Sequence, residues 1–140
     1  MSMSRSSSAI PTHRHKAMHR VLGQEINALL SAKMRTAPGL AQRLGYKVTE
    51  DGEYGEYAFS KRVSYVLPNR TSVSWRVEIA RSSNASEGNV ATLSMHTDKT
   101  SYTIFMDLHH VKISGALPSD ERAFYKKLHA TRVGAWSVAS

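Results

Sequence analysis

The sequence predicts an α+β domain with two N-terminal helices, a mostly antiparallel meander sheet of four or five strands, and one C-terminal helix. Three observations lead to this fold class. Apolar residues recur at helical spacing over residues 18–44, apolar and polar residues alternate over 56–115, and a second helical pattern follows Pro118. The connections between the alternating runs are too short for crossovers, so neighbouring strands should be antiparallel. A length of 140 residues fits one domain.

The helical segments have start and stop signals as well as periodicity. The first apolar stripe consists of Met18, Leu22, Ile26, Leu29 and Leu30, at steps of three and four. A second, shorter helix should begin near Pro38 and end at Gly45, since proline favours the first helical turn and glycine the residue after the last one. The C-terminal helix should begin after Ser119, which is a good N-cap, and end at Gly134.

In four segments between residues 57 and 113, apolar and polar residues alternate, which is typical of half-buried strands. In the second run, Trp75 shares its parity with three aliphatic residues, so we expect it in the core. A short leading strand at residues 47–49 would make a fifth. After His109 the alternation changes phase, because Val111 is apolar where a polar residue is due, and a β-bulge near His109-His110 would explain this.

The predicted domain is residues 13–134, between a flexible tail of residues 1–12 and a C-terminal tail of residues 135–140. Residues 1–11 are rich in serine and cannot bury enough apolar surface to order themselves. Trp136 is unusual for a tail. We expect it to pack into a groove of its own domain.

Bulk composition excludes several classes of protein. The chain has no cysteine, no apolar segment long enough to span a membrane and no secretory signal at its start, so we expect a cytoplasmic protein that does not enter a membrane. No nucleophile motif, glycine-rich phosphate loop or zinc spacing is present, so an enzyme is not the favoured interpretation and no cofactor is expected. His15 and His19 are four residues apart, but their neighbours are cationic, which opposes metal binding.

Positive charge is concentrated at the N-terminal end of the chain. Residues 1–49 contain eight Lys and Arg against one acid, whereas residues 50–115 are close to neutral, and the net charge of the chain is +8. Such asymmetry is typical of a protein with an anionic partner, most often nucleic acid.

The polar parity of the strands predicts one hydrophilic sheet face. It should carry Arg62, Arg76, Glu78, His96, Asp107 and His109, with serine and threonine between them. This face is either solvated, or a nucleic-acid platform on which Phe105 stacks a base, or a metal-independent ribonuclease site. In the ribonuclease reading, Glu78 is the base, His96 the acid, and Arg76 stabilises the phosphorane.

The favoured interpretation is a small basic nucleic-acid-binding protein that contacts phosphates mainly through its N-terminal helical region. The predicted contact residues are Arg14, Lys16, Arg20, Arg62, Arg76, Arg122, Lys126 and Lys127. The alternative is a non-enzymatic protein-binding module, such as the inhibitors, adaptors and assembly proteins that viruses and phages encode. In that case a sheet edge would pair with a partner protein or with a second copy of the chain.

Overall fold

The computed structural model describes residues 12–51, 56–82 and 89–138, and it confirms the α+β class. Helices α2 (Thr12–Ser31) and α3 (Ala37–Arg43) precede the sheet, and α5 (Ser119–Val138) follows it. The strands are β1 (Lys47–Asp51), β2 (Glu56–Val66), β3 (Ser72–Ser82), β4 (Val90–His96), β5 (Ser101–Met106) and β6 (Val111–Gly115). Residues 1–11 of the predicted flexible tail, which was residues 1–12, lie outside the described residues, and Thr12 is the first residue of α2. Within the described part of the chain, no helix is long and apolar enough to cross a membrane.

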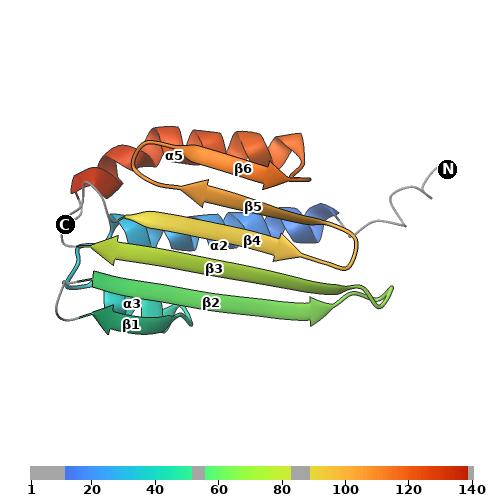
Figure 1. The fold of residues 1–140 in the computed structure, drawn as a ribbon, viewed down its shortest axis with the longest axis horizontal. Coiled ribbons are helices and arrows are strands. Elements are labelled where there is room, and N and C mark those ends of the chain that lie inside the picture. The colour runs from blue at the N-terminus through green and yellow to red at the C-terminus, as the bar shows by residue number, and fades with distance from the viewer. Residues whose placement is uncertain (1–11, 52–55, 83–88, 139–140) are drawn as a thin grey trace.

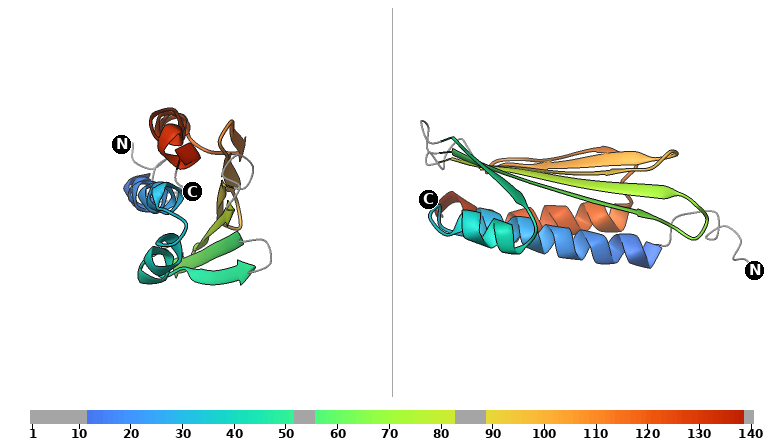
Figure 2. Two further views of the ribbon diagram at one scale, coloured as in Figure 1. Left: turned by 90° about the vertical axis from the view of Figure 1, so that its left-hand side faces the viewer. Right: turned by 90° about the horizontal axis from the view of Figure 1, so that it is seen from below.

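The strands form one antiparallel meander in the order β1-β2-β3-β4-β5-β6 (Figure 1). All three described helices lie against one face of this sheet, and none of them covers the other face (Figure 2). The predicted leading strand is present as β1, which pairs with the first half of β2. Among the described residues the sheet has six strands, rather than the four or five that were predicted.

The sixth strand arises where a β-bulge was predicted, and that prediction is wrong. Residues 107–110 form a tight turn, in which the Asp107 carboxylate accepts hydrogen bonds from the backbone N–H groups of His109 (2.7 Å) and His110 (2.6 Å). A new strand then begins, with Val111 opposite Met106. The change of apolar parity therefore marks a strand reversal. Asp107 and His109 lie in this turn and not on the polar sheet face.

The core lies between the sheet and the helices. Alternate residues of the central strands point to the helices and are buried, and Trp75 is fully buried as predicted. Helices α2 and α5 lie side by side and parallel. Lys16 pairs with Asp120 near their N-terminal ends, and Asn27 accepts a hydrogen bond from Trp136 near their C-terminal ends. These contacts make one helical layer from segments far apart in the sequence.

The last helix continues past its predicted end. Gly134 lies inside α5, which reaches Val138, so residues 135–138 are not a tail. Trp136 has no exposed surface, and its indole Nε1–H donates to the Asn27 side chain at 2.9 Å. The prediction that Trp136 packs on its own domain is therefore confirmed. Its burial gives the helix a reason to continue, because glycine alone costs only about 1 kcal/mol relative to alanine inside a helix.

A buried arginine ties the end of α2 to the sheet. The Arg81 guanidinium donates to the backbone carbonyls of Leu29 (2.6 Å) and Ala32 (2.7 Å), and to the Asn89 side chain (3.2 Å). The last carbonyls of a helix have no partner within the helix, and they carry partial negative charge that favours a cation. Arg81 therefore caps α2 and sets its position over β3.

Gly115 ends β6 in a conformation that requires glycine. Its φ is +93°, and an added Cβ would lie 2.4 Å from the carbonyl oxygen of Ser101 and 2.7 Å from Tyr102 Cα. Backbone atoms cannot move aside as a flexible side chain can. We expect Gly115→Ala to lower the free energy of unfolding by about 3 kcal/mol, from left-handed strain and overpacking together. Urea unfolding measures this. Gly134→Ala is the control, because its Cβ would meet no atom within 4 Å and should not destabilise the protein.

Candidate nucleic-acid interface

The side of the sheet opposite the helices is here called the open face. Every second residue of each strand points to it. The strand register sets these residues in rows across the sheet. One row runs from Arg62 through Arg76 and Ser94 to Thr103. Hydroxyl groups are frequent on this face, and Ser94 and Thr103 hydrogen-bond to each other at 3.2 Å. The predicted hydrophilic sheet face therefore exists, with Arg62, Arg76, Glu78 and His96 on it.

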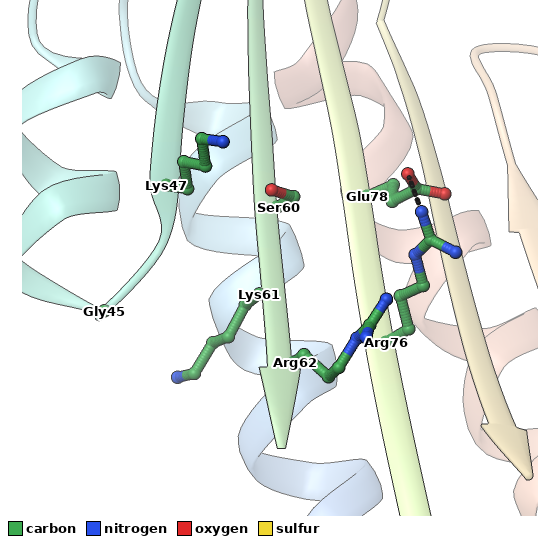
Figure 3. Close-up of a pocket in the computed structure, with 7 residues that line it drawn as sticks. All are labelled: Gly45, Lys47, Ser60, Lys61, Arg62, Arg76 and Glu78. Carbon is green, nitrogen blue, oxygen red and sulfur yellow. Dashed lines mark hydrogen bonds and ion pairs between the residues drawn. The ribbon is translucent and has the colours of Figure 1, made fainter. Parts of the chain in front are cut away.

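A basic pocket lies on the open face, where β1 begins and β2 continues past it. Its volume is about 400 Å³. The pocket is lined by Gly45, Lys47, Ser60, Lys61, Arg62, Arg76 and Glu78 (Figure 3). Four of these seven residues are cationic and one is acidic.

Arg62 and Arg76 are direct partners on neighbouring strands. Figure 3 shows the Arg62 side chain extending toward Arg76. Like charges directly opposite each other in a sheet are destabilising, so this arrangement opposes folding slightly. Glu78 offsets part of the repulsion, because its carboxylate accepts a hydrogen bond from Arg76 at 3.0 Å. An anion bound between the two guanidinium groups would offset the rest.

The cations of the pocket differ in how far their charge is already neutralised. The Lys61 ammonium points away from Arg62, toward the helices, where it contacts Glu25 at 3.1 Å and donates to the Leu44 carbonyl at 2.8 Å. Lys47 and Arg62, by contrast, have no ion pair with any described residue, and both are exposed. These two residues therefore supply the free positive charge of the pocket.

The three cations of α2 that were predicted to contact phosphate each interact with another side chain of the protein. Arg14 lies over the Tyr65 ring at 3.9 Å, and Lys16 is 3.5 Å from the Asp120 carboxylate. Arg20 lies over the Phe124 ring at 4.1 Å and is 3.7 Å from the buried Glu121 carboxylate. They belong to α2, which lies in the helical layer on one side of the sheet (Figure 2), whereas the basic pocket lies on the open face.

Of the three predicted contact residues on α5, one has hydrogen-bond partners within the protein and two are exposed. Arg122 donates to the carbonyls of Leu117 (3.0 Å) and Gly115 (3.2 Å) and so holds the loop between β6 and α5. Lys126 and Lys127 are exposed. The eight predicted contact residues thus form two surfaces on opposite sides of the sheet. One flat ligand could not contact both.

The three residues of the ribonuclease alternative share the open face without forming one site. Glu78 is opposite Thr92, whereas His96 is opposite Ser74. The two are therefore four residues apart along the strands, or about 13 Å at the usual rise per residue. An acid and a base that act on the same phosphodiester must both reach it, so this spacing argues against the pair.

His19 lies in the core rather than on a basic surface. It is fully buried, and its ring nitrogens hydrogen-bond the hydroxyls of Tyr125 (2.7 Å) and Tyr102 (2.8 Å). The ring also packs edge-on against Trp75, with centroids 5.0 Å apart. Burial, with nearby His15 and Arg20, lowers the pKa of His19 to about 3, so the ring is neutral at physiological pH. It belongs to the structure and not to a phosphate site.

The sequence prediction missed the two lysines of the pocket. Lys47 begins β1 and is opposite Ser60 in the sheet, so it shares the open face with Arg62. Lys47 was predicted to lie in a short strand at residues 47–49, but the pattern did not show which residues of the next strand it pairs with. A comparison of the chain with models of protein families, with curated proteins and with solved structures found no significant match.

Proposed function

We propose that this protein binds nucleic acid through its phosphates, and that the basic pocket on the open face is the main contact. The observation that carries the proposal is the pair of exposed cations, Lys47 and Arg62, which have no ion pair with a described residue and lie beside Arg76 on the open face. Phosphate contacts position a protein on nucleic acid without reading sequence. The net charge of +8 would also raise the local concentration of any polyanion.

The N-terminal helix takes a secondary part in this proposal. Each of its three predicted contact residues would have to leave an intramolecular partner before it could neutralise a phosphate. Lys16 and Arg20 remain partly accessible, with 45% and 43% of their side chains exposed. They therefore contribute to the long-range positive field more than to direct contacts.

Removing the free charge of the pocket should weaken binding and its salt dependence. For Lys47→Gln combined with Arg62→Gln, we expect the slope of log K against log salt to fall by about 1.4 on single strands, since each neutralised phosphate contributes about 0.7. Fluorescence anisotropy with labelled oligonucleotides over a series of KCl concentrations measures the slope. Affinity should fall equally for unrelated sequences.

The matched control is Lys126→Gln with Lys127→Gln, which removes the same charge from the helical side. We expect a smaller change in slope from this pair. An equal change would show that net charge, and not the pocket, governs binding. If the wild-type protein binds neither DNA nor RNA at low salt, the proposal is wrong.

One observation favours a protein-binding function as the second candidate. β1 pairs only with residues 56–60 of β2, so the outer edge of residues 61–66 has no neighbouring strand within the described chain. Val66, at the end of this edge, is 64% exposed. An exposed edge can accept a strand from a partner. Such binding would change little with salt, whereas binding of phosphates would weaken steeply.

A further inference from the structure

Among the described strands, Phe105 is the one phenylalanine, tyrosine or tryptophan on the open face. Its neighbours along β5, Ile104 and Met106, point to the helices and are fully buried, whereas Phe105 is partly exposed. Across the sheet it is flanked by Thr92 on β4 and Lys112 on β6. A phenyl ring on a hydroxyl-rich, solvated face gains little from packing there. It does present a flat apolar surface to a ligand.

The Phe105 ring already lies beside a cation. The Lys112 ammonium is 6.0 Å from the ring centroid, at the outer limit of a cation–π contact. Lys112 is exposed and has no ion pair with a described residue. A base stacked on Phe105 would therefore have a positive charge within reach of its own phosphate. Stacking on aromatic side chains is the sequence-tolerant way in which proteins hold single strands.

The dimensions of the sheet decide between a single strand and a duplex. Six strands about 4.8 Å apart make a surface about 24 Å wide. The major groove of B-DNA is about 12 Å wide and admits a helix or a two-stranded ribbon. The open face therefore cannot enter the groove, and a duplex lying on it would offer only phosphates. Phe105 can reach the face of a base only if that base is unpaired.

From these observations we infer that the ligand of the open face is single-stranded nucleic acid, with one base stacked on Phe105 and phosphates held by the basic pocket and by Lys112. This inference rests on the proposed function. From Arg76 to Phe105 the path crosses two strand spacings and two residues along the strand, which is about 12 Å. A few nucleotides span that distance. The strand would cross the β-strands obliquely, over Ser94 and Thr103.

The test compares ligands that differ only in whether they offer unpaired bases. The probes are the single strands rU12 and dT12, a 12-base-pair DNA duplex, and inorganic polyphosphate of similar charge, titrated calorimetrically against the whole chain. We expect the single strands to bind more tightly than polyphosphate or duplex. Phe105→Ala should weaken single-strand binding by about 5- to 150-fold, the usual range for losing one stacked base, and leave polyphosphate binding unchanged.

Two further variants distinguish stacking on an aromatic ring from contact with any large apolar side chain. Phe105→Leu keeps an apolar side chain without a ring and should lose the same affinity, whereas Phe105→Trp should retain or increase it. If the Phe105 variants bind rU12 and dT12 as the wild type does, while Lys47→Gln with Arg62→Gln weakens them, the stacking inference is overturned and the proposed function stands. Duplex binding as tight as single-strand binding also overturns the inference. Absence of binding to every probe removes the proposed function as well.

Discussion

Replacing Trp75 with alanine is expected to lower the free energy of unfolding by about 4 kcal/mol, within the usual range for truncation of a large buried aromatic residue. Trp75 is fully buried in the middle of β3. Its indole Nε1–H donates to the Tyr65 hydroxyl at 2.9 Å, and its ring packs against His15 and His19 of α2. The substitution therefore leaves a cavity at the junction of the sheet and the first helix, and also an unpaired hydroxyl.

Urea unfolding measures the loss, and the chain retains a fluorescent reporter. Trp136 is also fully buried, so its emission still follows unfolding in the variant. Trp75→Phe is the control, because it keeps most of the apolar volume and loses only the hydrogen bond to Tyr65. We expect it to cost about 1 to 2 kcal/mol. An unchanged unfolding midpoint for Trp75→Ala would contradict the placement of this residue in the core.

Local sequence pattern was enough to predict the core of the sheet. The parity that places Trp75 inward depends only on the pleat of one strand, and the helical stripe of α2 depends only on its own period. The number of strands could not be read in the same way. Residues 107–110 reverse the chain without glycine or proline, and a four-residue turn shifts the apolar parity just as a bulge does.

The partners of the charged side chains could not be predicted, because they come from distant parts of the chain. Arg14 meets Tyr65 on β2, and Lys16 and Arg20 meet the first turn of α5, some hundred residues later. The amount of positive charge and its concentration toward the N-terminal end of the chain can therefore be read from the sequence. Which of these cations have partners within the protein cannot be read from the sequence. Because the α2 cations have such partners, we propose an interface on the open face instead of on α2.

His19 shows the same limit for a titratable group. In the sequence it stands among His15, Lys16 and Arg20, which suggests a solvated basic helix. On a helix, however, neighbouring residues point in different directions, and His19 points inward with the stripe that includes Leu22 and Ile26. Its two tyrosine partners, from β5 and α5, satisfy both ring nitrogens. The burial of His19 could have been predicted from its position on the apolar face of the helix.

The buried His19 should make the protein sensitive to acid. Its folded-state pKa of about 3 lies below the unfolded value of 6.5, so between these pH values the unfolded chain binds a proton that the folded chain does not. The stabilisation is therefore complete above pH 6.5 and is lost as the pH falls toward 3. The slope is about 1.4 kcal/mol per pH unit, and the total on the order of 5 kcal/mol. The pKa of His15 is also lowered by burial, so it acts in the same direction.

Urea unfolding of the wild type and of His19→Gln between pH 3.5 and 7.5 tests this. Glutamine does not titrate, so unfolding of the variant should take up about one proton fewer than unfolding of the wild type. Its free energy of unfolding should therefore depend less steeply on pH. His96→Gln is the matched control, because it makes the same substitution at a histidine that is exposed on the open face. The difference in slope, rather than the absolute stability, is decisive, since the carboxylates contribute equally to all three proteins. Equal slopes for wild type and His19→Gln would show that folding does not lower the pKa of His19, and would contradict the prediction.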